Sequence, residues 1–140
     1  MSADDLGELI ALTAAEVDDR PWLPLGDDPG VTQKLLWQSG NVRLGLMRIE
    51  PGSINPVHTH ATAQHHILVT QGSATMVGKQ MSAGAYVYVP PGVPHGVTDV
   101  GPDGVTFFYT YRPITADDTA EADQHGRHPA VSDAEAAVAF

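Results

Sequence analysis

Four histidines and one glutamine lie at spacings that strands could bring to one point. Residues 58–66 read HTHATAQHH. Because alternate residues of a strand face the same side, His58 and His60 would point together and form a bidentate arm for a metal ion. His65 comes just before the apolar run ILV, and an antiparallel return would bring its imidazole back to the same face. This spacing predicts a metal centre.

A fourth histidine, His95, lies in the segment PPGVPHGV, a rigid proline- and glycine-rich turn that feeds another expected strand. The chain has no cysteine, which excludes disulfides and thiol chemistry. The ligands must therefore be nitrogen and oxygen atoms, a set that indicates Zn, Fe, Ni, Cu or Mn rather than a thiolate zinc finger.

The elements that carry these histidines are expected to be short strands. The chain of 140 residues is the size of one domain, and its 14 glycines and 11 prolines suit many strands joined by turns. Runs rich in Val, Ile, Leu and Tyr predict eight strands, over 33–38, 42–50, 54–60, 64–70, 73–78, 85–89, 94–99 and 104–112. Eight strands in about eighty residues predict an all-β sandwich or barrel.

Two segments flank this strand-rich region. Near-helical spacing of apolar residues and a capping-box arrangement predict a short helix over residues 3–17, on Ser2, Asp5, Leu6, Leu9, Ile10 and Val17, ended by Pro21 and Pro24. We therefore divide the chain into an N-terminal arm (1–28), a barrel (29–113) and an acidic C-terminal tail (114–140). Within the tail, residues 132–140 could form one or two helical turns.

Charge is distributed unevenly along the chain. The formal net charge is −10, yet residues 1–28 hold eight acids and one base, residues 113–140 six acids and one base, and residues 29–112 three acids and five bases. We interpret the acidic ends as solvated or partner-facing segments, and with this net charge we expect no nucleic-acid partner. No apolar run approaches the length of a membrane span, and the acidic start MSADDLGELI is unlike a targeting peptide. We expect a cytoplasmic protein that binds no membrane.

The histidine segments resemble the two cupin motifs. Residues 52–72 are similar to the first, G-x5-H-x-H-x3,4-E-x6-G, and residues 84–99 to the second, G-x5-P-x-G-x2-H-x3-N; the matching positions are Gly52, His58, His60, Gly72, Gly84, Pro90, Gly92 and His95. The resemblance covers about residues 30–112. It implies a single-cupin (jelly-roll) β-barrel whose metal is held inside by these histidines.

This chain departs from the motifs at the metal-binding glutamate. His65 stands there at the x4 spacing and Gln64 at the x3 spacing, and Asp99 replaces the final asparagine. A four-histidine set with a neutral glutamine resembles the small aromatic polyketide cyclases of the resistomycin-pathway type. The resemblance implies one divalent ion per chain, zinc first and Fe or Ni as alternatives, on His58, His60, Gln64, His65 and His95.

Neutral ligands leave a divalent ion its full charge, which makes it a stronger Lewis acid for a β-dicarbonyl substrate. The prediction is a metal-dependent polyketide cyclase/aromatase that performs aldol cyclisation and dehydration of a poly-β-ketone, either free or carried on acyl carrier protein. Two alternatives stay open. One is an Fe(II) or Ni(II) cupin dioxygenase of a β-diketone or enol, and the other a non-catalytic metal- or ligand-binding sensor.

Three further side chains are candidates for catalysis. Tyr86 and Tyr88 share one face of the strand before Pro90, and either hydroxyl could bind a substrate oxygen. Arg48 could lie at the barrel mouth and pair with Glu50 or an acidic substrate group. His66 is expected to face away from the metal.

Other residues are expected to have structural roles. Four aromatic and apolar residues would form core or wall a pocket for a flat polyketide: Trp37, Met47, Phe107 and Tyr109. His125 and His128 are expected on the surface of the tail. The apolar face of the N-terminal helix needs a partner surface, so we expect a homodimer.

Overall fold

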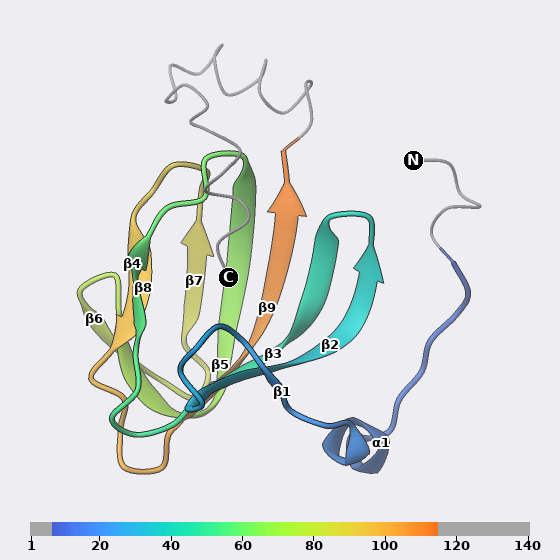
Figure 1. The fold of residues 1–140 in the computed structure, drawn as a ribbon, viewed down its shortest axis with the longest axis horizontal. Coiled ribbons are helices and arrows are strands. Elements are labelled where there is room, and N and C mark those ends of the chain that lie inside the picture. The colour runs from blue at the N-terminus through green and yellow to red at the C-terminus, as the bar shows by residue number, and fades with distance from the viewer. Residues whose placement is uncertain (1–6, 115–140) are drawn as a thin grey trace.

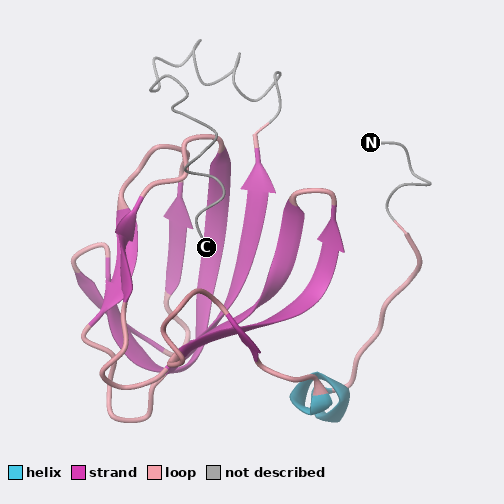
Figure 2. Ribbon diagram, viewed as in Figure 1, coloured by secondary structure: helices cyan, strands magenta, loops and turns pink. Residues whose placement is uncertain are grey.

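The computed structural model describes residues 7–114, which form one helix and an antiparallel sheet of nine strands that curls into a half-barrel (Figure 1; Figure 2). Along the sheet the strand order is β1-β2-β3-β9-β5-β8-β4, while β6 and β7 also pair with β5. The elements are α1 (Ala14–Asp19), β1 (Leu23–Pro24), β2 (Val31–Ser39), β3 (Val42–Ile49), β4 (Asn55–His58), β5 (Ala63–Met76), β6 (Lys79–Ser82), β7 (Tyr86–Val89), β8 (His95–Thr98) and β9 (Val105–Pro113).

The longest strand, β5, joins the two parts of the sheet. Its first half pairs with β7 and β9 and its second half with β6 and β8. The sequence predicted two strands, 64–70 and 73–78, where the structure has one strand with a bulge between Val69 and Gln71. Gly72 follows with a φ of 75°, and a Cβ there would collide with the Gly104 carbonyl oxygen. The glycine therefore marks a bend within a strand and not a turn.

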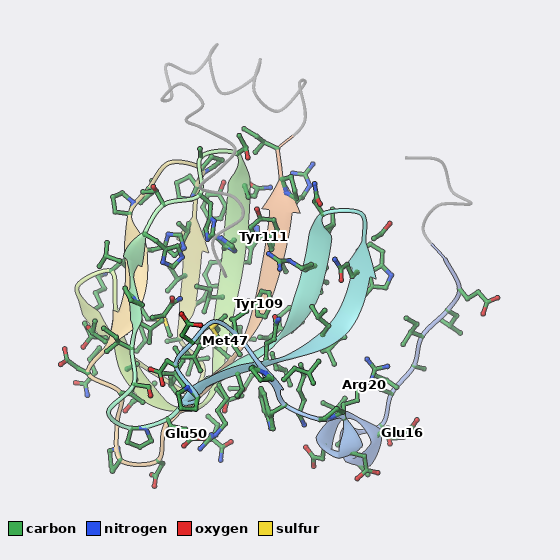
Figure 3. All side chains as sticks on the ribbon, viewed as in Figure 1. Glu16, Arg20, Met47, Glu50, Tyr109 and Tyr111 are labelled. Carbon is green, nitrogen blue, oxygen red and sulfur yellow. The ribbon has the colours of Figure 1, made fainter. Side chains whose placement is uncertain are left out.

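The inner face of the sheet is the hydrophobic core. Alternate residues of β3, β5, β7 and β9 are buried there, as the period of two requires. Met47, Phe107 and Tyr109 are fully buried among them, and Figure 3 shows Tyr111, Tyr109 and Met47 following one another down the inside. Trp37 instead pairs with Leu44 across a bulge of β2 and lines an outer-face groove.

The N-terminal helix is shorter than expected and begins later. Thr13 caps α1, whose first turn carries the reciprocal capping-box hydrogen bonds with Glu16. Gly7 has a φ of 81°, which a helix interior does not accept, and Leu9 is 95% exposed. The prediction of a helix was therefore wrong for residues 7–13. Ser2 and Asp5 lie outside the described residues.

The helix is held to the outer face of the sheet by Lys34. This buried ammonium donates to the carbonyl oxygens of Val17 (3.0 Å) and Asp18 (3.2 Å) and lies 4.7 Å from the centre of the Trp22 ring. A cation at a helix C-terminus is favourable because the last carbonyls carry partial negative charge. Within residues 7–114 no helix is long and apolar enough to cross a membrane. The expected tail helix and the histidines at 125 and 128 lie outside the described residues.

Candidate metal centre

Four histidines meet at one end of the half-barrel, the upper end in Figure 1, where β4, β7 and β9 end. His58 closes β4 and His95 opens β8, and the two are register partners. His60 follows in the loop after β4, and His65 lies on the buried face of β5. Asn55 and His58 are three residues apart, yet both pair with buried residues of β8, Val97 and His95. A bulge in β4 between them makes this possible.

Three of the imidazoles, those of His58, His60 and His95, are close enough to share one ion, and the His65 ring lies beside them. The Nε2 atoms of His58 and His60 are 3.1 Å apart, and the ligand atoms of His58, His60 and His95 all lie within 4.8 Å of one another. The His65 ring centre is 4.6 Å from that of His60 and 5.2 Å from that of His95. His60, His65 and His95 are buried and His58 is partly buried.

Backbone carbonyls set the orientation of three of the four rings. Nδ1 donates to a carbonyl oxygen in His65 (to Thr110, 3.0 Å), His95 (to Val93, 3.0 Å) and His58 (to Pro56, 2.6 Å). A carbonyl can only accept, so the hydrogen of each neutral ring is on Nδ1 and the lone pair on Nε2. Metal-binding histidines are held in the same way, with the second ring nitrogen donating to a carbonyl or carboxylate.

The donor set fits a divalent metal ion. Two ligands that bind one ion at about 2.1 Å stand about 3.0–3.4 Å apart, and the 3.1 Å between His58 Nε2 and His60 Nε2 falls in this range. All donors of the cluster are imidazole nitrogens, which suit Zn, Cu, Fe and Ni. The residues therefore fit a metal and do not by themselves select one.

His65 is held neutral by its surroundings. The pKa of His65 is lowered from 6.5 to about 2, mainly by burial and further by the neighbouring His60, His95 and His58, while the Thr110 carbonyl opposes the shift. A metal ligand must be deprotonated, so a proton competes weakly at this position.

Gln64 does not join the cluster. It precedes His65 on β5 and so faces the other side of the sheet, where its Oε1 accepts a hydrogen bond of 2.9 Å from the Tyr88 hydroxyl. Adjacent strand residues cannot both face inward in a regular ladder. The structure therefore brings together four histidines, and it leaves the glutamine on the outer face.

The two tyrosines also face outward. Tyr86 is 55% exposed and Tyr88 39% exposed, whereas Val87 and Val89 between and after them are buried. His66 faces outward as well, as expected, and its Nδ1 lies 2.6 Å from the Tyr86 hydroxyl. Neither tyrosine lines the interior beside the histidines, because the inward-facing residues of β7 are Val87 and Val89.

Arg48 lies at the opposite end of the sheet from the histidines. It forms the expected ion pair with Glu50, at 2.7 Å from Nε to Oε1 and 3.2 Å from Nη2 to Oε2. Its register partner on β9 is Thr106, whereas that of His65 is Tyr111, five residues or about 17 Å along the strand. The structure does not bring Arg48 to the cluster.

Comparison with known proteins agrees with this fold. A family model described as the ChrR cupin-like domain matches residues 11–115. This chain belongs to the family of ChrR cupin-like domains. No curated protein matches its sequence.

Solved structures show that this cupin shares its fold with proteins of several kinds. It is similar to KdgF from Halomonas sp. (19% identity, covering 71% of this chain and 92% of that one, TM-score 0.58). It is also similar to a predicted oxalate decarboxylase from Thermotoga maritima (16% identity, covering 75% of this chain and 100% of that one, TM-score 0.63). A third similar structure is that of Rhodobacter sphaeroides SigE in complex with the anti-sigma ChrR (23% identity, covering 77% of this chain and 54% of that one, TM-score 0.56). At these identities the likeness establishes the fold and leaves the activity open.

Two residues that sequence analysis missed complete the surroundings of the cluster in this cupin. The Tyr111 ring centre is 5.2 Å from that of His65 and 5.5 Å from that of His60. The Arg43 guanidinium carbon lies 4.5 Å from the centre of the Tyr111 ring. The period of two in Phe107, Tyr109 and Tyr111 could have identified Tyr111 as an inward residue.

Proposed function

We propose that this cupin binds one divalent ion at His58, His60, His65 and His95 and stabilises the enolate of a β-dicarbonyl substrate, with aldol cyclisation and dehydration of a poly-β-ketone as the reaction. The observation that carries the proposal is the purely imidazole donor set, which cancels none of the charge of the ion. When bound, the ion would supply a Lewis acid that acidifies the carbon between two carbonyls.

The chain's own residues would keep this centre ordered and dry. The carbonyls of Pro56, Val93 and Thr110 orient three rings, so the donors need little rearrangement when a metal binds. The buried residues around them, including Tyr111, keep water from the inner side of the cluster. An environment of low polarity strengthens the interaction between a fixed positive charge and a developing enolate.

A dioxygenase is the second candidate, and the position of Gln64 favours it. The sequence assigned five protein ligands, which would leave one position on a six-coordinate ion. With Gln64 bonded to Tyr88 on the outer face, four protein ligands remain, and two positions could accept an enolic substrate and O₂ together.

A ligand-binding sensor is the third candidate, and the family match favours it. The family takes its description from ChrR, and the solved ChrR is an anti-sigma bound to SigE. In such a role the metal would hold a small ligand or the fold, with no turnover.

Turnover with and without oxygen separates the three candidates. Zinc-loaded protein is mixed with a linear poly-β-ketone under anaerobic conditions, and products and O₂ consumption are compared with those in air. The cyclase proposal expects the same aromatic product in both, loss of activity in His60→Ala, and retained activity in Tyr88→Phe. Strict dependence on O₂ and on Fe(II) or Ni(II) would favour the dioxygenase. Metal-dependent binding without any product would favour the sensor.

A further inference from the structure

Arg43 is a partly buried cation at the same end of the half-barrel as the histidines. It is the second residue of β3 and shares the inward parity of Gly45 and Met47, which are buried. Its guanidinium carbon lies 4.5 Å from the centre of the Tyr111 ring. The side chain is therefore fixed at the rim by a cation–π contact and not by an anion.

Register places Arg43 in one row with the metal site. Arg43 on β3 pairs with Tyr111 on β9, and Tyr111 pairs with His65 on β5. Two interstrand spacings separate Arg43 from His65, about 10 Å between their Cα atoms. Between them stands Tyr111, whose ring contacts both the guanidinium and the imidazoles of His60 and His65.

The charge of Arg43 has no carboxylate to neutralise it within residues 7–114. Two other cations have polar partners: Lys34, on the outer face, donates to the last carbonyls of α1, and Arg48 is paired with Glu50. Burial raises the pKa of the Tyr109 hydroxyl, and the nearby Arg43 guanidinium opposes that shift. A planar guanidinium of this kind is the group that binds a carboxylate through two parallel hydrogen bonds.

We propose that Arg43 is the carboxylate-binding subsite of this cupin, so that its substrate is a free acid with an enolisable dicarbonyl group at the histidine cluster and a carboxylate at Arg43. A carrier-bound thioester or an ester lacks the anion and would not be held there. This inference rests on the proposed function, since it assumes that the dicarbonyl oxygens bind at the cluster.

A pair of probes that differ only in the carboxylate tests the subsite. The probes are 4,6-dioxoheptanoate, a β-diketone with a carboxylate two methylene groups away, and its methyl ester. Calorimetry on the zinc-loaded protein measures Kd for each. We expect the acid to bind the wild type about 10- to 100-fold more tightly than the ester, the range for a hydrogen-bonded charge pair of this kind.

Variants assign the preference to one guanidinium. Arg43→Gln should bind acid and ester equally, with the ester Kd unchanged, and Arg43→Lys should keep part of the preference. Arg112→Gln is the matched control, because Arg112 is the exposed neighbour of Tyr111 on β9 and its loss should leave the preference intact. The unchanged ester Kd also shows that the site is still folded.

The outcomes distinguish the two proposals. If the ester binds but the wild type does not prefer the acid, or if Arg43→Gln keeps the preference, the subsite is overturned and the proposed function stands. If neither probe binds the wild type, whether it is loaded with zinc or with Fe(II), the proposed function fails and the subsite fails with it.

Discussion

Lowering the pH should destabilise the metal-free protein, and His65 sets a calculable part of the effect. Its pKa is about 2 in the folded chain against 6.5 for an ordinary histidine. Between these values the unfolded chain binds a proton at this residue and the folded chain does not. The free energy of unfolding therefore decreases as the pH falls below 6.5, and the contribution of His65 is fully present only above that value.

The magnitude follows from the two pKa values. Well between the two pKa values, each pH unit by which the solution is acidified lowers the free energy of unfolding by about 1.4 kcal/mol. From pH 7.5 to pH 5.0 the loss attributable to His65 is about 2 kcal/mol, which is a large share of the stability of an ordinary domain. Because the residue is fully buried, solvent does not screen this effect appreciably.

Urea unfolding in the presence of a chelator measures the loss. The wild type is compared at both pH values with His65→Leu, which removes the buried imidazole, and with His66→Leu, which removes the exposed imidazole next to it. The pH-dependent loss should be smaller by about 2 kcal/mol in His65→Leu and unchanged in His66→Leu. An equal loss in wild type and His65→Leu would show that His65 is not held buried and neutral in the folded chain.

Three further predictions concern the metal and the assembly. His58→Ala or His60→Ala should lose most bound metal, because each deletes one donor of the His58, His60 and His95 group, and full occupancy by elemental analysis would contradict the ligand assignment. His65→Glu should retain metal but cyclise more slowly, since a carboxylate cancels part of the metal's charge; equal or faster cyclisation would count against the charge argument. Leu68 on the outer face of the sheet is 44% exposed and Leu9, in the segment before α1, is 95% exposed, so we expect a homodimer. Sedimentation should give about twice 14.8 kDa, and the mass of one chain would rule this out.

The histidine cluster could be predicted because it depends on short-range rules. His58 and His60 lie two residues apart, and the Pro/Gly turn that carries His95 has a distinctive composition. The sequence could also have decided which of Gln64 and His65 faces the metal. His65 shares its parity with Ile67 and Val69, which are buried, so only His65 could face inward.

The features that sequence analysis missed depend on pairing between distant segments. The row of Arg43, Tyr111 and His65 joins three strands whose register no local pattern reveals. The single long strand β5 required a bulge, and Gly72 within it reads equally well as the turn between two strands. The late start of α1 follows from the capping box at Thr13, which competes with a weaker pattern nearer the N-terminus.

X-ray absorption spectroscopy of the protein purified without added metal tests the metal centre most directly. We expect one divalent ion per chain whose first shell contains only nitrogen and oxygen, with outer-shell scattering from about four imidazoles. We also expect the same spectrum in Tyr88→Phe and an altered one in His65→Glu. Absence of stoichiometric metal, or a first shell dominated by carboxylate oxygen with at most one imidazole, would contradict the four-histidine centre.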